Sequence, residues 1–264
     1  MFNHRRFLNQ LPTVVALLCA TLALSGCIRT LDKPESKVDK GQALEANIKL
    51  GMTYLQQNKR EGAVRSFSKA LEIDKKSAEA YLGMALLHQL NGEIPEAEAN
   101  FKKALRSRVD FSRASIEYSY GRLLYEQERY EESMALFQAA AGDYAYVRRA
   151  EALLNVGRVA LKLGDNIRAK GAFEYSLNLE PRMAQSALEL ADLAFSARDY
   201  TEAKKYLDQF SNDSRHEPRS LWLGIRIERI FENKDREASY AMALKNLYPY
   251  SKEYLDYKRF IEQN

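Results

Sequence analysis

A 34-residue periodicity runs through most of the sequence and limits more strongly than any other feature what the chain can fold into. Counted from Leu44, the block that contains Ala63 and Phe67 is followed 34 residues later by one that contains Ala97 and Phe101. Small and aromatic residues return at the matching places of later blocks, and two-residue insertions precede the third and the fourth. A period of this length indicates a repeat protein, in which each unit packs mainly on its neighbours.

Each block has the features of a helical hairpin. Apolar residues recur at helical spacing, as at Leu50 and Tyr54, and small residues such as Gly157 and Ala169 stand where two helices would approach closely. Turn residues such as Gly92 fall between the two helices of a block. One hairpin cannot bury its apolar face alone, so stacking of successive hairpins completes the core. The sequence therefore predicts an all-α fold, a right-handed α-solenoid of about six hairpins.

The same periodicity predicts the domain boundaries. We expect a polar tether over 27–43 and a closing, capping helix over 250–264. The six predicted blocks are 44–77, 78–113, 114–149, 150–183, 184–218 and 219–252.

The first 26 residues have the pattern of a cleaved signal peptide. Arg5 and Arg6 give the start a positive charge, and the segment 11–24 that follows is uncharged and mostly apolar. These fourteen residues are too few to cross a bilayer, which needs roughly 20.

The end of this segment, Leu24-Ser25-Gly26-Cys27, resembles a bacterial lipobox. The resemblance implies cleavage before Cys27 and a covalent N-acyl and S-diacylglycerol lipid on that residue, and two or more acyl chains anchor a protein stably. Because Ile28 is not the Asp that retains lipoproteins at the inner membrane, lipoprotein sorting implies the outer membrane, facing the periplasm. The alternative is a buried hydrophobic N-terminal helix with an incidental cysteine.

Composition argues against several classes of function. With 40 basic and 36 acidic residues the chain is close to neutral, which gives no case for a nucleic-acid partner. Of the two cysteines, Cys19 lies in the segment that is cleaved away and an acylated Cys27 cannot pair, so we expect no disulfide. The Cys and His sets of structural zinc are also missing from the sequence. The histidines are His4, His88 and His216; we expect His88 to pack in the core and His216 to lie in a solvated turn. No catalytic set is present, so we expect no enzyme activity, no metal, no cofactor and no small-molecule substrate.

The blocks resemble the tetratricopeptide repeat over residues 44–252. Together with the lipobox and the tether, they are similar to the type IV pilus biogenesis/stability lipoproteins, the PilF/PilW-type pilotins. That resemblance implies an accessory protein that binds outer-membrane secretin subunits, brings them to the outer membrane and promotes their oligomerisation, in support of twitching motility. Two alternatives share the lipid and the repeats: a lipoprotein of β-barrel assembly and an adaptor for peptidoglycan hydrolases.

The resemblance also implies a site, because the first helices of tetratricopeptide hairpins line a groove. Apolar residues at the groove positions predict a surface for a protein partner. The alternative is that these side chains pack on one another or are covered by the tether or the final helix. The predicted groove residues are Ile48, Met52, Leu55, Leu82, Leu86, Tyr118 and Tyr125.

The lipobox makes a direct prediction about Cys27. A Cys27→Ala variant has no thiol to acylate, so we expect a folded, soluble periplasmic protein and a mislocalised secretin. Fractionation of cells into membrane and soluble proteins measures this, with the unaltered chain as control. If the variant stays bound to membranes, the lipobox interpretation is wrong.

Overall fold

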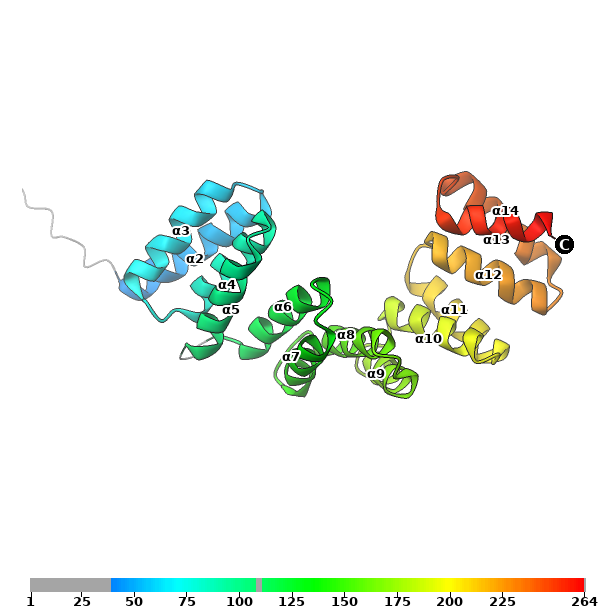
Figure 1. Ribbon diagram of the computed structural model, residues 1–264, viewed down its shortest axis with the longest axis horizontal. Helices are drawn as coiled ribbons and strands as arrows, with labels where there is room; N and C mark the ends of the chain where they lie inside the picture. Colours follow the sequence, from blue (N-terminus) through cyan, green and yellow to red (C-terminus); the bar gives the residue numbers. More distant parts are fainter. Residues whose placement is uncertain (1–38, 108–110, 264) are drawn as a thin grey trace, which may run out of the picture. The chain divides into compact units, whose positions relative to one another are not determined.

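The computed structural model describes residues 39–107 and 111–263. Within these ranges the chain forms thirteen α-helices and no strands (Figure 1). The helices are α2 Lys40–Gln56, α3 Arg60–Ile73, α4 Ala78–Asn91, α5 Ile94–Arg106, α6 Arg113–Glu126, α7 Tyr130–Gly142, α8 Arg149–Lys162, α9 Asn166–Leu179, α10 Ala184–Ser196, α11 Tyr200–Asp213, α12 Pro218–Ile230, α13 Lys234–Leu247 and α14 Lys252–Glu262.

The helices pair into six hairpins, and each hairpin packs on the next. Within a pair, α4 contacts α5, α6 contacts α7, and the pattern continues to α12 and α13. Between pairs, the second helix of one hairpin packs on the first helix of the next, as α7 does on α8. This is the tetratricopeptide solenoid that the period predicts.

Each hairpin turn contains one residue in the left-handed region. Two are glycines, which adopt this conformation without strain. At the other turns a larger side chain accepts it, at a cost of roughly 1 kcal/mol. In chain order the residues are Asn58 (φ 55°), Gly92 (78°), Glu128 (58°), Gly164 (78°), Arg198 (63°) and Glu232 (54°).

A phenylalanine of the second helix fixes the spacing of the helices around it. Phe67 is completely buried and lies against Gly51 in its own hairpin and Gly83 in the next. Phe173 lies in the same way against Gly157, where an added Cβ would come 2.3 Å from the ring. The small residues of the repeat are therefore needed to let helix backbones approach an aromatic ring.

The N-terminal predictions meet the structure only in part. Helix α2 begins at Lys40, so residues 40–43 are helical and the predicted tether is four residues too long at this end. The signal peptide and the lipobox residues Leu24, Ser25, Gly26 and Cys27 lie outside the described residues. No described helix has both the length and the apolar character needed to cross a bilayer.

The sixth hairpin corrects the predicted repeat frame. Gly224 faces the ring of Tyr240, so these two residues take the places of Gly157 and Phe173, two residues earlier than a frame that starts at Arg219. Met242, which that frame assigns to the packing face, is 64% exposed. The frame failed because tyrosine replaces phenylalanine and Arg236 replaces the small residue four positions before the ring.

The C-terminal helix α14 packs on α12. Trp222 of α12 makes edge-to-face contacts with Tyr257 and Phe260 of α14, with ring centroids 6.2 and 5.6 Å apart. These contacts cover the apolar side of the last hairpin, as we expected of a capping helix.

The prediction that His216 lies in a solvated turn is wrong. Its ring is half-buried between Phe210 and Tyr240, with centroids 6.0 and 5.2 Å away, and Nδ1 is 3.1 Å from the Ser220 hydroxyl. Burial lowers the pKa of His216, and the charge of Arg236 adds to this effect. The imidazole is therefore a neutral part of the junction between α11 and α12.

The close contact at Gly157 predicts opposite effects for two glycine substitutions. Gly157→Ala forces a methyl group into the Phe173 ring, so we expect destabilisation by about 1–3 kcal/mol. Gly171→Ala in α9 is the matched control, because no atom lies within 4 Å of its added Cβ, and we expect stabilisation by roughly 0.5–1 kcal/mol. Urea unfolding measures both, and equal effects would contradict the packing described here.

The lowered pKa of His216 predicts loss of stability in acid. The unfolded chain binds a proton at this residue as the pH falls below about 6.5, whereas the folded chain resists it, so the free energy of unfolding decreases as the pH falls through that window. We expect His216→Phe, which keeps a ring between Phe210 and Tyr240, to reduce this dependence. Thermal unfolding at pH 7.5 and 5.5 measures it; an unchanged slope in the variant would contradict the assignment.

Candidate functional site

The first helices of the first three hairpins form a depression of about 480 Å³, which we call the apolar depression. Each of these helices contributes side chains from its C-terminal half, so the depression bridges three repeats. The lining residues are Leu55 and Gln56 of α2, Leu86, Gln89 and Leu90 of α4, and Ser119, Arg122 and Glu126 of α6.

The apolar depression has one side formed by leucines and one side formed by polar groups that bond to one another. Leu90 is 46% exposed and is accompanied by Leu55 and Leu86. On the α6 side, Gln89 Nε2 donates to Glu126 Oε2 at 2.8 Å, and Arg122 lies 3.7 Å from the other oxygen of that carboxylate. An accessible apolar patch with a polar rim is typical of a protein-binding surface.

The structure divides the predicted groove residues into two groups. Leu55 and Leu86 line the apolar depression. Three others are buried: Ile48 is 6%, Leu82 5% and Tyr118 6% exposed.

The remaining two predicted residues are partly buried. Met52 packs against the two core clusters of the first hairpins, and Tyr125 makes an edge-to-face contact with Tyr130 at 5.6 Å. Met52 thus packs on the core as well as facing the surface, as the partly buried Leu55 and Leu86 also do. Leu90, which was not among the predicted groove residues, is more accessible, as is Arg122 at a groove position of the third block.

A second depression of about 530 Å³ continues from the first, and the two share Arg122. Its lining is mainly polar and comes from the helices that follow along the chain. The residues are Tyr118 and Arg122 of α6, Glu151, Leu154, Asn155 and Arg158 of α8, Glu180 before α10, and Met183 at its N-cap.

Tyr118 organises the second depression. Its hydroxyl donates to Glu151 Oε2 at 3.2 Å and accepts from Asn155 Nδ2 at 3.2 Å, while the Arg148 guanidinium lies 4.6 Å from the ring centre. Burial raises the pKa of Tyr118, so the phenol stays protonated at neutral pH. The tyrosine that we predicted as a contact residue therefore holds other polar side chains in place.

Ion pairs extend this polar character to the first helices of the last hairpins. Glu189 of α10 is 5% exposed and accepts from Arg158 Nε at 3.2 Å and from Arg219 Nη2 at 2.6 Å. Arg219 also pairs with Asp192. Burial by itself would raise the pKa of Glu189, but Arg219 and Arg158 outweigh it and hold that pKa below its ordinary value.

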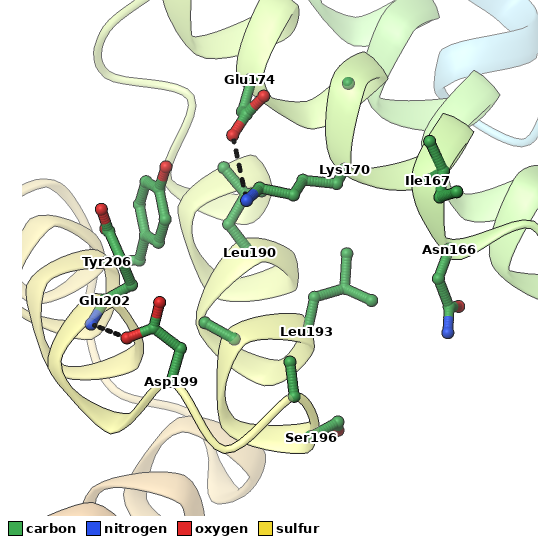
Figure 2. Close-up of a pocket in the computed structure, with 13 residues that line it drawn as sticks. Asn166, Ile167, Lys170, Glu174, Leu190, Leu193, Ser196, Asp199, Glu202 and Tyr206 are labelled. Atoms are coloured by element: carbon green, nitrogen blue, oxygen red, sulfur yellow. Dashed lines mark hydrogen bonds and ion pairs between the residues drawn. The ribbon is translucent and has the colours of Figure 1, made fainter.

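A separate cleft of about 680 Å³ lies between the fourth and fifth hairpins. Figure 2 shows Leu193 of α10 projecting into it, with Leu190 below the ion pair of Lys170 and Glu174 and with Tyr206 on the α11 side. Our sequence reasoning did not find this cleft, which is formed partly by second helices.

The cleft has a local origin in the sequence. Asn166 and Lys170 of α9 stand at the repeat positions that Tyr130 and Met134 occupy in α7. Met134 is 5% exposed and packs into the core, whereas Lys170 extends outward to Glu174. The junction between these hairpins is therefore less filled than the preceding one.

Metal chemistry has no support in the part of the chain that the structure describes. No group of three or more His, Cys, Asp or Glu side chains there is arranged to hold an ion. His88 Nδ1 lies 2.6 Å from Glu93 Oε2 at a hairpin turn, where it ties the turn together.

Comparison with known proteins identifies the same repeat fold and, within it, a particular family. Family models described as TPR repeat and Tetratricopeptide repeat match residues 51–92, and residues 82–147 and 154–214, respectively. Over 250 residues the chain is 40% identical to the type IV pilus assembly protein PilF of Pseudomonas aeruginosa, covering 93% of this chain and 98% of that protein.

Two solved structures agree with this relationship. Pseudomonas aeruginosa PilF matches with a TM-score of 0.78 at 40% identity, covering 83% of this chain and 98% of that one. The crystal structure of PilW, described as a widely conserved type IV pilus biogenesis factor, matches with a TM-score of 0.69 at 28% identity, covering 81% and 98%. The identity to PilF, its near-complete coverage and the shared solenoid place the chain in the PilF/PilW family of tetratricopeptide-repeat proteins of type IV pilus biogenesis.

Proposed function

We propose that this chain is the pilotin of a type IV pilus system. It is anchored by lipid on Cys27 to the outer membrane, faces the periplasm, and binds secretin subunits through the apolar depression. It brings the subunits to the outer membrane and promotes their assembly into a ring. The relationship to PilF and PilW supports the pilus system, and the surface on α2, α4 and α6 supports a protein partner.

The observation that carries the proposal is a set of leucines on the first two hairpins, of which Leu90 is exposed and Leu55 and Leu86 are partly buried. Leu55, Leu86 and Leu90 come from two successive first helices and meet the polar edge of a third. Fully burying an exposed leucine side chain is worth about 1.5–3 kcal/mol. These three are already partly buried, so a partner helix with an apolar face gains a fraction of that at each position, before the costs of association.

The polar edge adds orientation to this apolar contact. Gln89, Arg122 and Glu126 already bond to one another, so their donors and acceptors are held in place before a partner arrives. Groups held in place lose less entropy on binding than mobile ones. We therefore propose that the leucines supply most of the affinity and that the polar groups at α6 fix the position of the partner along the depression.

The lipid turns this binding into localisation. Cys27 supplies affinity for the membrane and the apolar depression supplies affinity for the subunit. A subunit captured by an anchored protein is confined near the bilayer, where its effective concentration toward other captured subunits rises. This linkage promotes oligomerisation without any catalytic step.

The decisive variant is Leu86→Glu combined with Leu90→Glu. Two carboxylates in the apolar depression oppose burial by an apolar partner, so we expect secretin binding to weaken at least tenfold, or about 1.4 kcal/mol. The matched control is Leu179→Glu with Leu247→Glu, because these leucines are 39% and 65% exposed and lie outside both depressions.

Affinity purification of the lipidated protein from membranes, followed by mass spectrometry, measures the partner, and thermal unfolding confirms that each variant is folded. Secretin retained by the control and lost by the Leu86/Leu90 variant supports the proposal. Secretin bound equally by both variants contradicts the site. Barrel-assembly components or cell-wall hydrolases in place of secretin contradict the function.

A further inference from the structure

Arg226 of the last hairpin has no carboxylate partner among the residues that the structure describes. Arg226 lies seven residues after Arg219 on α12, two turns along the same face. Its guanidinium carbon is 4.5 Å from the centre of the Phe195 ring and 5.2 Å from that of Trp222. Within the described residues its one hydrogen bond runs from Nε to the Trp222 carbonyl oxygen at 3.5 Å, and no carboxylate lies within 4.0 Å of its guanidinium.

Around Arg226, the arginine side chains outnumber the carboxylates by one. On the first helices α8, α10 and α12, the carboxylates of Glu189 and Asp192 face three guanidinium groups, those of Arg158, Arg219 and Arg226. Arg158 and Arg219 use both carboxylates. Arg226 therefore keeps a positive charge that the fold does not neutralise.

A second network, which joins Glu228 of α12 to side chains of the second helices α11 and α13, is balanced by comparison. Buried Glu228 accepts from Lys204 at 2.7 Å and pairs with Arg236 at 3.1 Å, and Arg236 also pairs with Asp208 at 2.7 Å. Two cations meet two carboxylates there. The excess on the first-helix side is thus a local feature of that surface.

Burial makes this excess costly. A guanidinium carries five N–H donors in a planar fork that suits a carboxylate, and Arg226 uses one of them weakly. Burial lowers the pKa of Arg226, and the charges of Asp192 and Asp256 only partly oppose this. Asp256 itself pairs with Lys252 and Arg259. An external carboxylate would supply what these groups do not.

We propose that Arg226, held between Phe195 and Trp222, binds a carboxylate from an acidic segment of a protein partner. Arg226 is partly exposed, and the two rings that contact its guanidinium restrict its orientation before the ligand arrives. A single carboxylate matches the one excess positive charge. A phosphate, with about −1.5 to −2 charges, would meet repulsion from Asp192 and Glu189, so the charge favours an acidic polypeptide.

This inference extends the proposed function, because Arg226 belongs to the same series of first helices as the apolar depression. An acidic segment at Arg226 would give a bound partner a second, charge-selective contact. The site itself is tested without the secretin, so either proposal can fail alone.

Trp222 is the only tryptophan of the chain, so its fluorescence reports directly on this site. The probe is a hexaglutamate peptide with blocked ends, titrated into the full chain at low ionic strength. We expect a saturable change in fluorescence that is at least tenfold weaker in Arg226→Gln. Arg226→Lys keeps the charge but loses the fork, and we expect intermediate binding.

The matched control is Arg148→Gln. Arg148 also lies over an aromatic ring, that of Tyr118 at 4.6 Å, but it already pairs with Glu151. We expect this variant and the Leu86→Glu/Leu90→Glu variant to bind hexaglutamate as the unaltered chain does. Hexalysine and inorganic phosphate should give no saturable change.

A purely structural role for Arg226 predicts different results. If the cation–π contacts only hold α10 to α12, Arg226→Gln lowers the melting temperature and hexaglutamate has no effect on the unaltered chain. We expect the melting temperature to stay within about 2 °C or rise, because an uncompensated charge is removed. Absence of saturable binding, or equal binding by Arg226→Gln, overturns the proposal.

Discussion

The contact between an aromatic ring of a second helix and a glycine of a first helix is the interaction on which the rest of the structure depends. Phe67 against Gly51 and Gly83, Phe173 against Gly157, and Tyr240 against Gly224 set how closely the helices of a hairpin and of its neighbour approach. Because the contact recurs, the first helices come to lie in series. A surface shared by three hairpins exists only because this spacing is maintained.

That surface changes character along the chain. On α2 and α4 it carries leucines that line the apolar depression, and on α6 it carries that depression's polar edge. On α8, α10 and α12 it carries ion pairs, and Arg226 there has no carboxylate partner within the described residues. Apolar contacts give affinity without strong selectivity, and charged contacts select among partners and guide their approach. A partner that follows the first helices would meet both kinds of contact, which suits a protein that must capture one subunit type among many envelope proteins.

The period of the sequence predicts the fold because the residues that set the packing are nearly the same in each copy. Where the copies diverge, prediction failed. The frame of the sixth hairpin was predicted two residues too late, because Tyr240 and Arg236 replace the usual phenylalanine and small residue. His216 was predicted to be solvated because it follows a polar stretch, but its ring packs between Phe210 and Tyr240, which belong to different helices. At the turns of Glu128 and Arg198 the left-handed residue is not a glycine, so the sequence does not predict its conformation.

The candidate site was only partly predictable for a related reason. Repeat position identifies which helix face a residue occupies, but the depth of a side chain depends on what the neighbouring hairpin places against it. Leu86 and Leu82 are one turn apart, yet Leu82 is 5% exposed and Leu86 lines the apolar depression. The cleft beside Leu193 was not predicted either, because it arises where the fourth hairpin has Asn166 and Lys170 in place of the Tyr130 and Met134 of the third.

The central claim is that a secretin subunit lies on the first helices of the first three hairpins. The most direct measurement is site-specific photo-crosslinking in cells that assemble pili, with the photoreactive residue at position 90 and, in a separate strain, at position 247. The account predicts a crosslink to the secretin from position 90 and none from position 247. A secretin crosslink from position 247 alone, or from neither position in cells that assemble the secretin normally, would contradict it.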